Sequence, residues 1–132
     1  MAVPSSVEAR IFYRCVFQRH EDALVLLTAD RTTGAVYLGG FGIECSFKAL
    51  VLSALAPAAR TDMLGLFRGV RGHNYEWLRS QYLNNAGTRF PRQITEALTL
   101  VNGWSTDLRY LPRTLKRREA ETFLAAGAEI IR

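Results

Sequence analysis

Apolar residues in the first part of the chain recur at three- and four-residue intervals, which is the spacing of an amphipathic helix. Ser5 is followed three residues later by Glu8, the pattern of a capping box at a helix start. We therefore expect a first helix from about Ser6 to Thr28. The polar, glycine-containing sequence of residues 29–34 then predicts a short turn.

A second helix is predicted from about Ala35 to Leu55, with apolar residues around nearly its whole circumference, as is typical of the central helix of a bundle. Glu44 and Lys48 lie four residues apart near its middle, which favours an ion pair on one face. These charges make the segment a poor membrane span, so we expect no membrane association. The glycines within residues 39–42 would weaken the helix unless they let a neighbouring backbone come close.

Beyond the second helix the pattern becomes less regular. Pro57 is expected to end that helix, and residues 58–72 mix a short apolar stretch with several glycines. A third helix is predicted from His73 to Leu83, because apolar and aromatic residues return there at helical spacing. Its stop signal consists of Asn84, Asn85 and Gly87.

The last third of the chain predicts two more helices. A fourth should begin near Pro91, a residue suited to a first helical turn, and bury apolar side chains as far as Trp104. Residues 107–112 connect it to a last helix that starts near Thr114. No extended strand pattern or repeat interrupts the sequence. We therefore expect one all-α domain over residues 1–132, an antiparallel up-and-down bundle of four to five helices.

The charge and the cysteines indicate which ligands the protein attracts and in which redox compartment it resides. The net charge is +5 and the pI about 9.7, so the protein should attract anions such as phosphates. Lys48 and Lys116 are the only lysines, and the remaining cations are arginines, which bind phosphate oxygens with two hydrogen bonds at once. A GC-rich genome would enrich arginine equally well. Cys15 and Cys45 stand among apolar residues, which indicates small buried side chains in a reducing compartment.

Other features bear on location and cofactors. The chain does not open on a basic stretch followed by an apolar run, so we expect no signal peptide and a cytoplasmic protein. Histidines, cysteines and carboxylates form no cluster at metal-ligand spacing. Neither a metal nor another cofactor is expected.

Several short motifs follow one another in a distinctive order over about residues 10–131. The run from Glu44 to Leu50 resembles the glutamate, three residues, lysine, alanine, leucine segment of the HEPN family, small helical proteins associated with nucleotides and nucleic acids. In the first helix, Asp22 and Ala23 are similar to the aspartate-led stretch that precedes this segment in the family. The order and spacing of the motifs carry the resemblance.

Two further motifs extend it. His73, Asn74, Tyr75 and Leu78 resemble the motif that opens the third helix in one HEPN branch, with asparagine and tyrosine replacing aspartate and leucine. An arginine–tyrosine–proline connector leads to the last helix in the family, and its counterpart here has one inserted leucine. That counterpart is Arg109, Tyr110, Leu111 and Pro112. The residues that the resemblance marks as binding or orienting a ligand are Glu44, Lys48, Arg109 and Tyr110.

One HEPN branch consists of metal-independent ribonucleases that use an arginine and, four to six residues later, a histidine. Arg68 and His73 stand at this spacing, with Arg71 between them. In such an enzyme the histidine moves the proton of the ribose 2′-hydroxyl and a cation holds the phosphate. In that branch, however, the motif lies on the last long helices, and no histidine follows Arg109 here. The other interpretation is that His73 caps the third helix and packs against the first or second.

Glu44 also has two interpretations. Its ion pair with Lys48 can serve only to compensate a buried charge and to keep the helices in register. Alternatively, the carboxylate orients His73 or an arginine across the helix interface. Both remain open from the sequence.

The resemblance implies a non-catalytic homodimeric module that binds a nucleotide, nucleic acid or a partner protein such as a nucleotidyltransferase or a toxin. Aromatic residues that include Trp77 and Trp104, together with the apolar second helix, also favour a dimer. The alternatives are a metal-independent ribonuclease that uses His73 with Arg68 or Arg71, and a pure protein-interaction subunit of the antitoxin kind.

Overall fold

The part of the chain that the structure describes contains helices and no strands. The computed structural model describes residues 2–86, 89–112 and 114–131. Six α-helices and two short 3-10 helices follow one another: α1 (Val7–Thr28), α2 (Thr32–Ala54), α3 (Pro57–Phe67), η1 (Val70–His73), α4 (Tyr75–Ala86), α5 (Arg92–Val101), η2 (Thr106–Tyr110) and α6 (Arg117–Ile131). The all-α class predicted from the sequence is confirmed.

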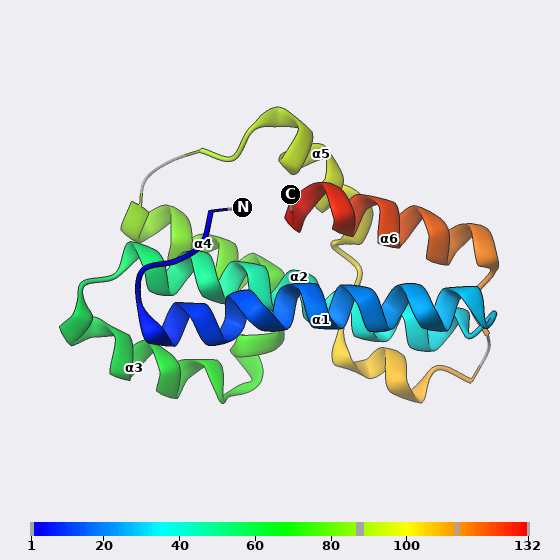
Figure 1. Ribbon diagram of the computed structural model, residues 1–132, viewed down its shortest axis with the longest axis horizontal. Helices are drawn as coiled ribbons and strands as arrows, with labels where there is room; N and C mark the ends of the chain where they lie inside the picture. Colours follow the sequence, from blue (N-terminus) through cyan, green and yellow to red (C-terminus); the bar gives the residue numbers. More distant parts are fainter. Residues whose placement is uncertain (1, 87–88, 113, 132) are drawn as a thin grey trace.

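The first two helices form a long antiparallel hairpin (Figure 1). The N-cap of α1 is Ser6, whose hydroxyl oxygen accepts a hydrogen bond from the Ala9 amide at 3.2 Å. The predicted capping box of Ser5 and Glu8 is therefore wrong by one residue, although the start of the helix is as expected. The turn to α2 passes through Asp30, which adopts the left-handed conformation with φ at 61°.

Helix α2 is the centre of the molecule. In Figure 1, α1 runs along its whole length, α4 covers its second half, and α6 covers its first half. Ile43 packs beside Gly127 of α6, and Phe47 packs against Tyr75 of α4. The helix is long and apolar enough to cross a membrane by length and composition, but 78% of its most apolar stretch is buried inside the bundle. Its apolar circumference is therefore used by the protein's own core.

Gly40 shows why glycines occur in the first half of this helix. The indole of Trp104 lies where a Cβ of residue 40 would be, so any larger side chain would collide with the ring. The expected approach of a neighbouring backbone occurs at Gly42, where a Cβ would lie 3.2 Å from the Val16 carbonyl oxygen of α1. At Gly40 the neighbour is instead a buried aromatic side chain.

Helix α3 was not predicted from the sequence, because residues 58–72 have no regular apolar pattern. Helix α2 ends at Ala54, before Pro57, and Pro57 is the first residue of α3. Proline suits this position because the first residue of a helix needs no amide hydrogen bond. Met63 and Phe67 of α3 are buried, and this tertiary packing outweighs the glycine in the helix. The bundle therefore has six α-helices in its described part rather than the four or five expected.

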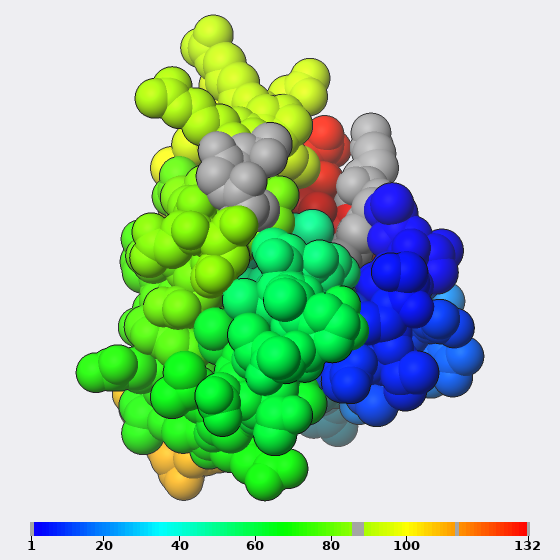
Figure 2. All heavy atoms as spheres, turned by 90° about the vertical axis from the view of Figure 1, so that its left-hand side faces the viewer, coloured from blue at the N-terminus to red at the C-terminus, as the bar shows by residue number. Residues whose placement is uncertain are grey.

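Other boundaries also differ from the expectation. Helix α5 ends at Val101, so Trp104 lies in the following loop rather than in the helix, and α6 begins at Arg117 rather than near Thr114. Gly87, part of the predicted stop signal after α4, lies outside the described residues. Figure 2 shows the end of the molecule where α3 and its flanking residues lie between the start of α1 and α4.

Candidate binding face around His73

Glu44 and Lys48 form an ion pair inside the bundle. The Lys48 Nζ lies 2.8 Å from the Glu44 Oε2, and the two side chains are only 7% and 4% exposed. The ammonium group also lies over the rings of Phe12 and Phe67, at 5.6 and 5.3 Å from their centroids. The predicted pairing of these residues is therefore present, and the buried carboxylate has a cationic partner.

The same carboxylate holds His73. Its second oxygen, Oε1, lies 2.8 Å from His73 Nδ1, while 42% of the histidine side chain remains exposed. Because a carboxylate only accepts hydrogen bonds, Nδ1 carries the proton, and in the neutral ring Nε2 is the free basic nitrogen. The contacts expected from both interpretations of Glu44, the ion pair with Lys48 and the contact with His73, are therefore present together.

The backbone before His73 is tightly folded. A Cβ at Gly72 would collide with the backbone carbonyl of Phe67, the last residue of α3. Only glycine fits this close approach between α3 and η1. This turn brings the imidazole at the end of η1 back onto Glu44 in the middle of α2.

The imidazole of His73 packs against the first of a series of aromatic rings that contact one another. Phe41 of α2 meets His73 edge-on, with ring centroids 6.0 Å apart, and meets Trp104 in the same way at 5.1 Å. Trp104 stacks on Tyr75 at 5.3 Å, and the Tyr75 hydroxyl donates a 2.8 Å hydrogen bond to the carbonyl of Gly40. Burial raises the pKa of this phenol well above its ordinary value, so it remains a neutral donor. Through Phe41, the His73 imidazole is therefore connected to the buried rings of Trp104 and Tyr75.

The rings continue from His73 towards η2. Tyr37 meets Phe41 edge-on at 5.0 Å, and the Arg109 side chain of η2 lies close to the Tyr37 hydroxyl. The Arg109 guanidinium also lies 4.9 Å from the ring centroid of Tyr110. Interaction with the Tyr37 hydroxyl is the main reason why the pKa of Arg109 is raised above its ordinary value, and Tyr110 adds to this effect. We name Tyr37, Phe41, His73, Arg109 and Tyr110 the aromatic–arginine face.

A small cleft of about 300 Å³ opens beside His73. Its wall combines the aromatic side chains of Tyr75 and Trp104 with amides, hydroxyls and two carboxylates. The polar lining residues are Asn74, Glu76, Asn102, Ser105, Thr106 and Asp107. The cleft thus offers both donors and acceptors next to the basic nitrogen of the imidazole.

Arg68 and Arg71 lie close to His73 along the chain but do not join its hydrogen-bond network. Arg68 is the C-cap residue of α3, and Arg71 belongs to η1. Both side chains are exposed, and neither forms an ion pair within the described part of the chain. Their guanidinium groups are therefore accessible to an anionic ligand.

The other candidate residues predicted from the sequence are connected to one another by pairwise contacts. Glu44 contacts both the imidazole and Lys48. Arg109, which lies over the Tyr110 ring, is connected to His73 through Tyr37 and Phe41, two rings that the motifs in the sequence did not single out. Tyr37 and Phe41 are four residues apart on one helix, and this spacing in the sequence already indicates that the two rings lie on the same helix face. Across the described residues, no group of three histidine, cysteine or acidic side chains could hold a metal ion.

No protein-family model, no curated protein and no solved structure matches this chain. The geometry above is therefore the basis for any functional assignment.

Proposed function

We propose that the protein is a non-catalytic, HEPN-like homodimeric module that binds single-stranded nucleic acid or a nucleotide through the aromatic–arginine face. The observation that carries this proposal is the continuous contact from Arg109 through Tyr37 and Phe41 to His73. Proteins that bind single strands combine cations along the backbone path with aromatic rings on which bases stack. Tyr110, which is 72% exposed, offers such a ring beside a cation.

The surroundings of the face fit the same ligand class. Arg71 and Arg68 add accessible positive charge near His73, which favours phosphate groups. The polar cleft beside the imidazole offers donors and acceptors for a ribose or the edge of a base. A nucleotide would meet stacking, charge and hydrogen-bonding groups within one continuous surface.

The HEPN-like bundle remains part of the proposal. The support from this chain is that the glutamate and lysine of the family-like segment pair with each other on the central helix, and that the glutamate also contacts the histidine of the next motif. A nucleotidyltransferase or toxin-type partner belongs to the same proposal and follows from the resemblance. A cytoplasmic location is proposed on the sequence features given above.

A metal-independent ribonuclease is the second candidate, favoured by the hydrogen bond between Glu44 and His73. With Nδ1 held by the carboxylate, Nε2 could take the proton of a ribose 2′-hydroxyl as that oxygen attacks the adjacent phosphorus. The bond from phosphorus to the 5′-oxygen of the next nucleotide would break, that oxygen would take a proton from solvent water, and a 2′,3′-cyclic phosphate would remain, with Arg71 or Arg68 stabilising the phosphate charge. Binding remains the leading function because neither arginine is held in contact with His73 in the described structure.

Fluorescence anisotropy with a labelled single-stranded RNA tests the binding function. Arg109→Ala and Tyr110→Ala should each weaken binding by about tenfold, because each removes one stacking or cationic contact. Arg92→Ala is the matched control, since it removes the same charge from an exposed residue of α5 outside this face. Wild-type affinity should also fall steeply between low and high salt as counterions are released.

Equal weakening by Arg109→Ala and Arg92→Ala, with no effect of Tyr110→Ala, would show non-specific attraction and contradict the assignment of this face. Cleavage of the RNA by wild type in the presence of chelator would instead support the ribonuclease. In that case His73→Ala should abolish cleavage, and Arg68→Ala or Arg71→Ala should cost at least about 2 kcal/mol of transition-state stabilisation.

A further inference from the structure

The cleft beside His73 is small and its wall carries negative charge. Its volume of about 300 Å³ is at the lower end of the range for small-molecule sites, so it suits a single flat ring system rather than a whole nucleotide. Glu76 and Asp107 contribute two carboxylates to the wall, and no lysine or arginine among the described residues lines it. In a protein of net charge +5, this cleft therefore disfavours a phosphate and favours a group that donates hydrogen bonds.

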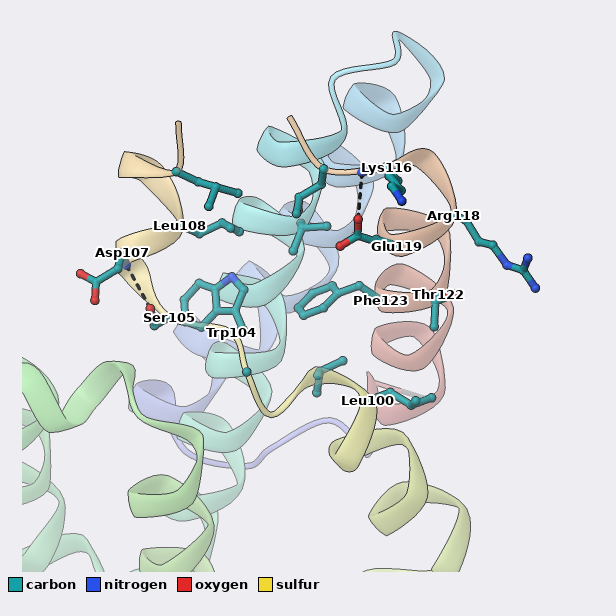
Figure 3. Close-up of a pocket in the computed structure, with 15 residues that line it drawn as sticks. Leu100, Trp104, Ser105, Asp107, Leu108, Lys116, Arg118, Glu119, Thr122 and Phe123 are labelled. Atoms are coloured by element: carbon teal, nitrogen blue, oxygen red, sulfur yellow. Dashed lines mark hydrogen bonds between the residues drawn. The ribbon is translucent and has the colours of Figure 1, made fainter. Parts of the chain in front are cut away.

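The two carboxylates are available to a ligand. Both residues are exposed, and neither side chain forms an ion pair or a hydrogen bond within the part of the chain that the structure describes. The backbone at Asp107 is held in place, because its amide donates a 3.2 Å hydrogen bond to Ser105 Oγ, the dashed line beside these residues in Figure 3. In that view the Asp107 carboxylate points away from the larger neighbouring cavity. Its oxygens can therefore accept hydrogen bonds from a ligand in the smaller cleft.

Asn74 adds a donor to the same cleft. Its Oδ1 accepts a 2.9 Å hydrogen bond from the Trp77 amide at the start of α4, which fixes the orientation of the side-chain amide. The Nδ2 group is the end of this amide that is left for a ligand. The cleft thus combines an oriented amide donor with carboxylate acceptors.

The bases of RNA differ in how well their Watson–Crick edges match such a combination. Guanine presents two adjacent N–H donors, at N1 and N2, beside the carbonyl oxygen O6. Adenine and cytosine each present one amino group beside a ring nitrogen that accepts hydrogen bonds, and uracil presents one N–H between two carbonyl oxygens. Because a carboxylate only accepts hydrogen bonds, it forms a bidentate contact with guanine and at most a single hydrogen bond with each of the other bases.

We propose that this cleft binds a guanine base of a single-stranded nucleic acid, with the Asp107 carboxylate accepting from N1 and N2 and the Asn74 amide donating to O6. The proposal rests on the function proposed above and adds base specificity to it. Asp107 is assigned rather than Glu76 because a 3-10 helix has three residues per turn, which places Asp107 and Tyr110 on the same side of η2. One nucleotide can then stack on the Tyr110 ring while its neighbour inserts a base into the cleft.

The test is fluorescence anisotropy with a labelled oligouridine and with the same strand carrying one central guanosine, inosine, adenosine or cytidine. The guanosine strand should bind about fivefold to tenfold more tightly than the oligouridine, because only guanine forms the bidentate contact. Inosine lacks the N2 amino group and should keep only part of this gain. Adenosine and cytidine should likewise give smaller gains than guanosine.

Two substitutions separate base recognition from a general effect of charge. Asp107→Asn should remove the preference for guanosine but retain binding of the oligouridine, since Arg109 and Tyr110 are unchanged. Asp62→Asn is the matched control, because it removes the same charge from an exposed residue of α3 that does not line the cleft. It should shift the affinity for all strands alike and leave the preference for guanosine intact.

The outcomes distinguish the guanine site from the function on which it rests. Binding of the oligouridine with equal affinity for the guanosine, adenosine and cytidine strands would overturn the guanine site and leave the nucleic-acid function standing. A guanosine preference that persists in Asp107→Asn, or that Asp62→Asn removes equally, would overturn it as well. No binding of any strand would contradict both proposals.

Discussion

His73 is the residue at which the two candidate functions differ. A half-exposed imidazole that is hydrogen bonded to a buried carboxylate can act either as a structural partner of Glu44 or as a base. In both cases the carboxylate depends on it, because removing one partner of a buried polar group leaves the other incompletely compensated.

We therefore predict that His73→Ala lowers the free energy of unfolding by about 1–3 kcal/mol. His73→Asn should recover at least half of this loss, because the asparagine amide can place a donor near the position of Nδ1. Urea denaturation of the three proteins at the same pH measures the difference. An alanine variant as stable as wild type would mean that the hydrogen bond to Glu44 contributes nothing to folding.

At the scale of single helices, α2 and α5 contain ion pairs with the same spacing but opposite environments. Glu44 and Lys48 of α2 are buried, whereas Arg92 and Glu96 of α5 are 91% and 64% exposed at a distance of 2.9 Å. Loss of one partner should therefore lower the free energy of unfolding strongly for the buried pair of α2, where the remaining charge is desolvated, and only slightly for the exposed pair of α5.

Lys48→Met should destabilise the protein by about 3–5 kcal/mol, because it leaves the buried Glu44 without its cation. Arg92→Met, the matched control at the same spacing, should cost less than about 1 kcal/mol. Combining Lys48→Met with Glu44→Gln should recover part of the loss, since no uncompensated charge then remains. Thermal and urea unfolding measure all three. Additive losses in the double variant would contradict a coupled pair.

Glycines of two helices provide a second comparison. Gly40→Ala places a Cβ against the Trp104 indole, which is fixed by its stacking on Tyr75, and should cost about 1–3 kcal/mol through overpacking. Gly65→Ala in α3 meets no atom within 4 Å and should stabilise the protein by up to about 1 kcal/mol through helix propensity. Melting temperatures that move in the same direction for both would refute this packing account.

At the scale of the whole molecule, the reasons for expecting a dimer change with the structure. The apolar circumference of α2 is covered by α1, α4 and α6, and Trp104 is buried in the protein's own core. These features no longer require a second copy. A different surface does remain uncovered: Val7 and Ile11, four residues apart at the start of α1, are 70% and 59% exposed, and Val3 in the segment before the helix is 68% exposed.

We predict that the protein forms a homodimer through this part of α1. Ile11→Asp should convert it to a monomer, because a charge would then be buried in an apolar interface. Leu66→Asp, at an exposed apolar residue of α3, is the matched control and should leave the dimer intact. Light scattering measures the mass of each protein. A wild-type monomer at tens of micromolar would exclude the dimer.

The helical class and the long hairpin of α1 and α2 were determined by the sequence itself, because the spacing of apolar residues and the polar turn between them are local properties. The pair of Glu44 and Lys48 was equally predictable, since both residues lie on one helix face. Helix α3 was not, because its stability depends on burying Met63 and Phe67 against other helices.

Only the tertiary structure decided which distant residues meet. The contact between Glu44 and His73 joins residues 29 positions apart, and it depends on a turn that only Gly72 permits. The links from Tyr37 to Arg109 and from Gly40 to Trp104 likewise join separate elements. Periodicity reports which side of a helix is buried, but not what it is buried against. For that reason the candidate residues could be named from the sequence, while their assembly into one face required the fold.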